Sequence, residues 1–245
     1  MINHKLIKYI DIMIENYIKV DDVPRKNEYV CWLDLMGTKS LMKRSPTTCT
    51  INICQLHVCL SSFKSENVRL YPVMDGAFIT TKSKTDLKNF LRNVFSSMSN
   101  DFIEGKNHLY QSIIRASIAF GPLIHGIDIE SDKISKEYKN SLLFGLPMTQ
   151  AYSSENKAPP FGIYIDKSAR TFATPDEKPF TTRWYIWFDP KYDSGRLIKA
   201  INKFYDWAEK MSFCLPLNED TILLHKKKSE QYLNYYKNNP TQKNF

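Results

Sequence analysis

A single aspartate interrupts an otherwise apolar run near the start of the chain, and it restricts the fold more than any other feature. Residues 29–35 read YVCWLDL, a pattern typical of a buried strand, and Met36 and Gly37 then indicate a turn. Asp34 lies near the end of this run between two leucines. A carboxylate buried among apolar side chains is costly unless it is paired or bound to a metal. We therefore expect a buried strand that ends at a polar site.

A second aspartate lies in a predicted hairpin. Residues 68–73 and 77–81 are two short strand patterns joined through Met74, Asp75 and Gly76, and Asp-Gly is a strong hairpin signal. Taken singly, each aspartate is more simply explained as a turn or strand-end residue. If the hairpin pairs beside the strand at 29–35, however, the two carboxylates meet. Such a pair is the kind of ligand that Mg²⁺ or Mn²⁺ uses together with nucleotide phosphates.

Helical and strand patterns alternate along the chain without an internal repeat. This order predicts an α+β fold with a mostly antiparallel sheet. We expect an N-terminal helix and linker over residues 1–28, a central domain over 29–190, and C-terminal helices with a basic tail over 191–245 packed on the same domain. The predicted helices are 5–20, 49–64, 85–102, 147–155, 195–212 and 219–237, and further strands are expected at 112–120, turned by Gly121 and Pro122 into 123–129, and at 162–166 and 183–188.

The composition favours a polyanionic ligand and a reducing compartment. Lys and Arg number 34 against 26 Asp and Glu, a net charge of +8 that suits a nucleoside triphosphate and would also suit RNA or DNA. The five cysteines lack a disulfide-framework spacing and no signal peptide precedes them, which predicts a cytoplasmic protein. No apolar run approaches the roughly 20 residues of a membrane-spanning helix, so we expect no membrane span.

Several motifs occur in the order found in one enzyme family. Residues 32–37 (WLDLMG) resemble the hydrophobic-Asp-Ile-x-Gly signature on the first strand of class III nucleotidyl cyclases, and residues 71–76 (YPVMDG) resemble their second metal-binding hairpin. Residues 114–121 resemble the family's fourth strand, residues 144–155 the helix that follows, and residues 158–166 the next strand. Within this family the chain is most similar to the pyrimidine cyclases of Pycsar antiphage systems.

The resemblance implies a fold, a site and a reaction. The fold would have a ferredoxin-like βαββαβ core flanked by helices, with residues 29–190 as the catalytic domain. Asp34, Asp75 and the backbone carbonyl of Leu35 would hold two Mn²⁺ or Mg²⁺ ions, and the backbone amides of Gly37 and Thr38 would bind the triphosphate. A homodimer with active sites at its interface would convert UTP to 3′,5′-cyclic UMP and pyrophosphate. The product would signal to a cyclic-nucleotide-responsive effector in antiphage immunity.

The base-reading positions depart from those of purine cyclases. In those enzymes a Lys or Glu four residues before the second metal aspartate reads the base edge, whereas here the position is Tyr71. The bulk and single hydroxyl of Tyr71 favour a pyrimidine. The companion position falls near Leu142, which has no polar group.

The positions that brace the transition state also differ. The Asn and Arg of adenylyl cyclases are replaced by Thr149 and Ser153, which cannot supply a guanidinium charge. Arg115 occupies a motif position and is the candidate catalytic cation, although a salt bridge at the sheet edge explains it equally well. Arg170 and Arg183 are the other candidates.

Three hypotheses of different classes remain open. The first is a uridylate cyclase, with a cytidylate cyclase that makes cyclic CMP as its nearest variant. The second is a catalytically degenerate cyclase-like module, which the missing Asn and Arg favour and the retained Asp34 and Asp75 oppose. The third is a nucleic-acid-binding protein, supported by the +8 charge and 13% aromatic content, with salt-dependent binding and no metal requirement. The paired aspartates make a nucleoside triphosphate the expected ligand in preference to nucleic acid.

Overall fold

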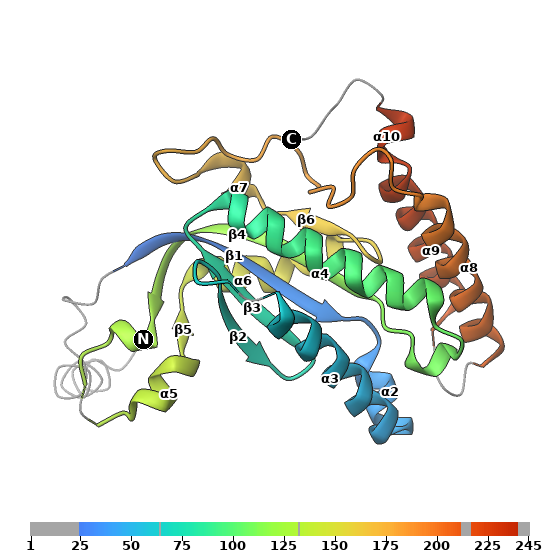
Figure 1. The fold of residues 1–245 in the computed structure, drawn as a ribbon, viewed down its shortest axis with the longest axis horizontal. Helices are drawn as coiled ribbons and strands as arrows, with labels where there is room; N and C mark the ends of the chain where they lie inside the picture. Colours follow the sequence, from blue (N-terminus) through green and yellow to red (C-terminus); the bar gives the residue numbers. More distant parts are fainter. Residues whose placement is uncertain (1–24, 64, 132, 212–216, 240–245) are drawn as a thin grey trace, which may run out of the picture.

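The structure is a computed structural model that describes residues 25–63, 65–131, 133–211 and 217–239. The helix expected at residues 5–20 lies outside the described residues. A six-stranded sheet runs through the described part of the molecule in the order β2-β3-β1-β4-β5, with β6 beside β4 (Figure 1). The strands are β1 (Lys26–Leu35), β2 (Arg69–Val73), β3 (Gly76–Thr81), β4 (Ile114–His125), β5 (Leu143–Phe144) and β6 (Ile163–Ile165).

Helices connect these strands in the manner of a ferredoxin-like core. The path from β1 through helices to the β2–β3 hairpin, and through a further helix to β4, places β1 between β3 and β4 with antiparallel pairing on both sides. The predicted α+β fold with a mostly antiparallel sheet is therefore confirmed. The α-helices are α2 (Thr38–Arg44), α3 (Pro46–Ser62), α4 (Lys84–Glu104), α5 (Lys136–Ser141), α6 (Leu146–Ser154), α7 (Lys167–Thr171), α8 (Ser194–Lys210), α9 (Glu219–Leu233) and α10 (Tyr235–Asn238), with 3₁₀ turns η2 (His108–Tyr110), η3 (Gly126–Asp128) and η4 (Glu155–Lys157).

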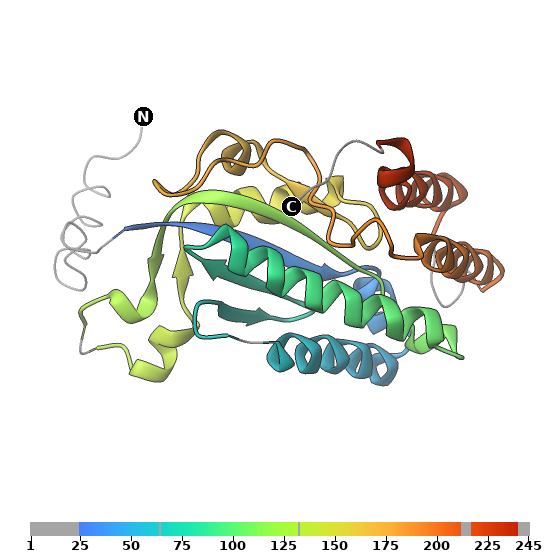
Figure 2. The ribbon, with the colours of Figure 1, turned by 45° about the horizontal axis from the view of Figure 1, so that its top comes forward.

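Alternate side chains of β1 enter two different cores. Cys31 and Leu33 face the larger core, which α3, α4, α8 and α9 also line. Figure 2 shows α3 and α4 together on one side of the sheet, with α6 on the other. Val30 and Trp32 face a smaller core that includes Ala151 of α6. Because side chains alternate along a strand, Asp34 shares the face of Trp32.

Helix α4 follows the predicted amphipathic pattern. The Ser83 side chain caps its first turn by accepting a hydrogen bond from the Asp86 amide, which satisfies a backbone donor that the helix cannot. Leu87, Leu91 and Val94 are buried at helical spacing against the sheet. The helix predicted at 85–102 is thus confirmed and is slightly longer than expected.

Two strand predictions are wrong. Strand β4 does not turn at Gly121 and Pro122, because both residues pair in register with β1. Pro122 has no backbone N–H to donate. Strand β5 pairs with β4 only at Ile124 and His125, so the proline removes no hydrogen bond between β4 and β5. Residues 183–188 form only an isolated bridge from Trp184 to Tyr164. Beyond this bridge, the backbone bonds to β6 are limited to Ile165 N–H to the Arg183 carbonyl and Tyr185 N–H to the Ile163 carbonyl, so no continuous ladder forms over 183–188.

The C-terminal helices pack into the larger core. Leu197 and Ile201 of α8 and Ile222 and Leu233 of α9 are buried in the same cluster as the central strands. Among the described residues, none of the helices combines the length and apolarity needed to cross a bilayer.

Candidate active site

The central position of β1 brings the two aspartates together. Asp34 pairs across the sheet with Gly76 of β3 on one side and with Arg115 of β4 on the other. Asp75 precedes Gly76 in the hairpin bend, and its carbonyl oxygen accepts a hydrogen bond from the Leu35 amide at 3.1 Å. This hydrogen bond therefore holds the bend of the hairpin against the end of β1, as expected if the hairpin pairs beside that strand.

Gly76 permits this close approach. A Cβ atom at this position would lie 2.4 Å from the carbonyl oxygen of Leu33 and 2.9 Å from the Trp32 ring. Any side chain would push the hairpin away from β1 and with it Asp75. The glycine of the Asp-Gly turn thus sets the separation of the two carboxylates as well as the bend.

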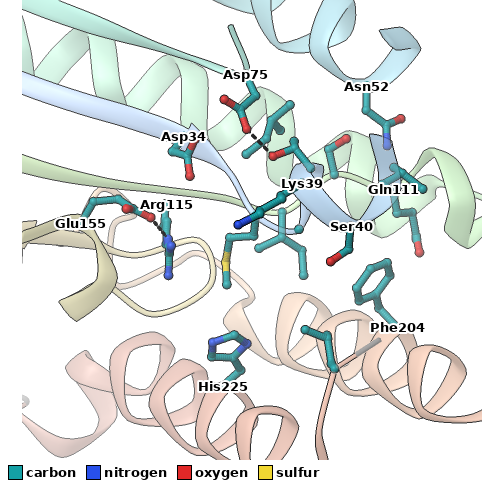
Figure 3. Close-up of a pocket in the computed structure, with 18 of the residues that line it drawn as sticks. Asp34, Lys39, Ser40, Asn52, Asp75, Gln111, Arg115, Glu155, Phe204 and His225 are labelled. Carbon is teal, nitrogen blue, oxygen red and sulfur yellow. Dashed lines mark hydrogen bonds and ion pairs between the residues drawn. The ribbon is translucent and has the colours of Figure 1, made fainter. Parts of the chain in front are cut away.

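A cavity of about 460 Å³ opens beside the aspartates (Figure 3). Its walls come from the end of β1, α2, α3, the η2 turn, β4, the end of α6 with η4, and α8 and α9. The charged and imidazole side chains among the residues that line it are Asp34, Lys39, Asp75, His108, Arg115, Glu155 and His225.

Asp34 is in an environment that disfavours its charge. Burial and, secondly, the charge of Asp75 raise its pKa to about 7, although Arg115 and the Leu35 amide act in the opposite direction. Two like charges at the end of a partly buried strand repel each other. A cation bound between them would relieve both effects.

Arg115 and Glu155 form an ion pair inside the cavity wall. Arg115 lies opposite Asp34 in the sheet, and Glu155 comes from the η4 turn and is 8% exposed. Burial lowers the pKa of Arg115, while the neighbouring Asp34 opposes that shift. Figure 3 shows Arg115 between Asp34 and the C-terminal helices.

The turn after β1 forms part of the cavity wall. Gly37 adopts a left-handed conformation with φ of 85°, which glycine tolerates without strain, and α2 begins at the next residue. The Thr38 hydroxyl donates a hydrogen bond to the Asp75 carboxylate. Leu35, Gly37 and Thr38 all line the cavity, so these predicted site residues lie together with Asp34 and Asp75.

Tyr71 lies elsewhere. It is buried in the smaller core and does not line the cavity. Its hydroxyl is 2.6 Å from Nδ1 of His125, and Nε2 of His125 is 3.2 Å from the Glu28 carboxylate. When Nε2 donates to Glu28 in the neutral imidazole, Nδ1 accepts from Tyr71, so the Tyr71 oxygen has only acceptor capacity left.

Other residues considered from the sequence also fall outside the cavity. Ser153 and Thr149 lie on the exposed side of α6, where the Ser153 hydroxyl donates to the Thr149 carbonyl at 2.7 Å. Arg170 donates its Nε to the Ile165 carbonyl, and neither it nor Arg183 lines the cavity. Leu142 directly follows α5 and is likewise absent from the lining.

Several lining residues were not predicted, and Lys39 and His225 are the two that matter most for charge and for the opposite wall. Lys39 follows the turn after β1. Its position two residues after Gly37, next to the predicted phosphate-binding amides, is the sequence feature that indicates it. His225 comes from α9, near the other end of the chain, so no local pattern identifies it. Its Nδ1 lies within hydrogen-bond distance of the Tyr205 hydroxyl, at 2.9 Å, and burial, together with Arg115 and Lys228, lowers its pKa to about 4. His225 is therefore neutral near pH 7.

The donor set fits a hard divalent cation. The described residues contain no group of three or more His, Cys, Asp or Glu side chains that could hold a metal by themselves. Mg²⁺ and Mn²⁺ commonly use one or two carboxylates and take their remaining ligands from water and substrate phosphates. The carboxylates of Asp34 and Asp75, with the carbonyl of Leu35 beside them, meet that requirement. Because the two carboxylates repel each other, a cation bound beside both of them would be stabilised by that removal of repulsion.

No protein-family model and no curated protein matches this chain. Among solved structures it is similar to a bacterial light-regulated adenylyl cyclase, with 12% identity and a TM-score of 0.47 over 66% of this chain and 53% of the other, so it spans about half the length of that protein. It is also similar to a dimeric guanylyl cyclase domain of the RhoGC fusion protein from Blastocladiella emersonii, with 14% identity and a TM-score of 0.45 over 60% of this chain and 83% of the other. A Trypanosoma brucei adenylate cyclase gives 11% identity and a TM-score of 0.46 over 64% of this chain and 81% of the other. Identities and TM-scores this low do not show that this chain has the activity of those proteins.

Proposed function

We propose that this protein is a nucleotidyl cyclase. The observation that carries the proposal is the meeting of Asp34 and Asp75 at the mouth of one cavity, in a donor set suited to Mg²⁺ or Mn²⁺. The particular reaction that we propose is the conversion of UTP to 3′,5′-cyclic UMP and pyrophosphate, with CTP and cyclic CMP as the alternative. In a bacterial cytoplasm, this product would act through a cyclic-nucleotide-responsive effector in antiphage defence of the Pycsar kind.

In this reaction the ribose 3′-oxygen forms a bond to the α-phosphorus and the bond to the bridging oxygen of the pyrophosphate breaks. The proton of the 3′-hydroxyl passes to solvent, and the electron pair of the broken bond stays on pyrophosphate. Two divalent ions, held by Asp34, Asp75 and the carbonyl of Leu35, would supply positive charge at the reacting oxygens. The protein positions the substrate: the amides of Gly37 and Thr38 bind phosphate oxygens, and Arg115 adds positive charge opposite Asp34.

A homodimer would complete the site. Large apolar side chains are exposed near the hairpin and α6, including Met74 at 84%, Leu146 at 65% and Tyr152 at 60%. Exposed apolar side chains of this size favour a protein partner, and we propose a second copy of the chain. Tyr71, which lies outside the cavity of its own chain, would then read the base of a nucleotide bound at the partner's aspartates.

The reaction itself is the test. The protein is incubated with ATP, GTP, CTP or UTP and Mn²⁺, and the products are identified by mass spectrometry. We expect cyclic UMP and pyrophosphate from UTP. Cyclic product from none of the four would refute the cyclase assignment, and nucleotide binding without turnover would then identify a degenerate cyclase-like module.

Substitution of Tyr71 should change the choice of base more than the need for metal. Tyr71→Lys replaces a hydroxyl, which can accept a hydrogen bond, with an ammonium that can only donate, so we expect the ratio of kcat/KM for UTP over ATP to fall by about tenfold, equivalent to one hydrogen bond of about 1.4 kcal/mol. The Mn²⁺ concentration for half-maximal rate should stay constant. Tyr138→Lys, at an exposed position on α5, is the control. An unchanged base preference would remove Tyr71 from the base site.

A further inference from the structure

The cavity contains few positive charges for the ligand that we propose. Asp34, Asp75 and Glu155 contribute negative charge, whereas Lys39 and Arg115 are the Lys and Arg side chains among the described residues that line it. His225 adds no charge near pH 7, because its pKa is about 4. A triphosphate that enters this cavity therefore meets only these two Lys and Arg side chains from the described lining.

The Arg115 side chain already has an acidic partner in the protein. It forms the ion pair with Glu155 and lies opposite Asp34 in the sheet. Glu155 is 8% exposed, so removing its partner would leave a carboxylate buried without compensation. The charge of Arg115 is therefore balanced in part by Glu155 and Asp34 before any substrate binds.

Lys39 is free by comparison. Its side chain makes no ion pair or hydrogen bond with any residue in the described ranges. Its backbone position is fixed nonetheless, because it follows the left-handed Gly37 and the Thr38 side chain is bonded to Asp75. In Figure 3 the Lys39 amine points into the cavity, toward the side where Asp34 and Arg115 lie. The backbone of Lys39 is thus held in place, while its ammonium group has no partner among the described residues.

We propose that Lys39 is a catalytic residue that binds the β- and γ-phosphates and neutralises the pyrophosphate as it leaves. The proposal rests on the cyclase function proposed above. As the bond from the α-phosphorus to the bridging oxygen breaks, the electron pair goes to pyrophosphate, and the Lys39 ammonium pairs with that growing charge. Lys39 takes the place of a cation that Thr149 and Ser153 on α6 cannot supply.

The test compares Lys39→Ala, Lys39→Arg and Lys43→Ala. Lys43 lies one turn further along α2, is exposed and does not line the cavity, so it controls for a general change of charge. We expect Lys39→Ala to lower kcat with UTP and Mn²⁺ by about 100-fold, as loss of one charge-stabilising donor does elsewhere, and Lys39→Arg to recover most of it. Isothermal titration with inorganic pyrophosphate and Mn²⁺ should show an affinity loss of about tenfold in Lys39→Ala alone.

The outcomes separate this proposal from the cyclase function. Wild-type protein that makes cyclic UMP, together with a Lys39→Ala variant of unchanged kcat and pyrophosphate affinity, overturns the role of Lys39 only. A lowered kcat with unchanged pyrophosphate affinity and a lower melting temperature also overturns it, because a structural effect then explains the loss. Wild-type protein that makes no cyclic nucleotide overturns the proposed function first, and the catalytic role of Lys39 with it.

Discussion

Replacing Asp34 or Asp75 with alanine is expected to abolish cyclic nucleotide formation, with a loss of at least about 1,000-fold in kcat. Bound metal ions supply several kcal/mol of transition-state stabilisation, and each factor of ten corresponds to about 1.4 kcal/mol. Because the two carboxylates line one cavity and, in the proposed site, hold the same ions, either substitution alone should have nearly the full effect. The measurement is the initial rate of cyclic UMP formation from UTP at saturating Mn²⁺.

Loss of the fold must be separated from loss of the site. Asp34→Asn keeps the shape of the side chain and removes a buried charge that Asp75 repels, so its melting temperature without metal should not fall. Asp101→Ala, an exposed carboxylate on α4, should retain wild-type activity. Activity retained in Asp34→Ala or in Asp75→Ala would contradict the assignment of that residue to the metal site.

The second large effect is expected at Arg115. Arg115→Leu leaves Glu155 buried without a partner and should lower the free energy of unfolding by about 3 kcal/mol. The double variant Arg115→Leu with Glu155→Leu removes both charges and should recover most of that stability, because apolar replacement of a buried pair is often neutral. Urea denaturation followed by circular dichroism gives these values.

The same pair of variants distinguishes a catalytic from a structural Arg115. If its charge acts on the substrate, the double variant is stable but remains at least about tenfold slower than the wild type. A double variant with full stability and full activity would show that Arg115 serves only as the partner of Glu155.

The fold near Asp34 could be predicted because its signals are local. The apolar run of β1, the Asp-Gly hairpin and the amphipathic spacing of α4 each depend on neighbours within a few residues. The partner of a strand in a sheet, by contrast, can lie far away in the sequence. Gly121 and Pro122 carry a turn signal, yet extended pairing with β1 keeps them in β4, since nothing in their own sequence reveals the length of the opposite strand.

The cavity could be predicted only in part. Asp34, Leu35, Gly37 and Thr38 are contiguous, and the hairpin brings Asp75 to them through adjacent strands. The opposite wall comes from α8 and α9, whose apolar faces indicate burial but not the surface against which they pack. His225 therefore enters the cavity without any signal in its own segment. The hydrogen bond from Tyr71 to His125 likewise joins β2 to the end of β4.

The most direct test of the central claim is a count of the metal ions that Asp34 and Asp75 hold together. Mn²⁺ binding is titrated by electron paramagnetic resonance in the presence of 3′-deoxy-UTP, which lacks the attacking hydroxyl and therefore does not react. We predict about two Mn²⁺ per chain in the wild type, close enough for spin coupling, and loss of the coupled signal in both Asp34→Ala and Asp75→Ala. A coupled signal that survives either substitution, or a wild-type protein that binds no Mn²⁺ with the nucleotide, would contradict a shared metal site.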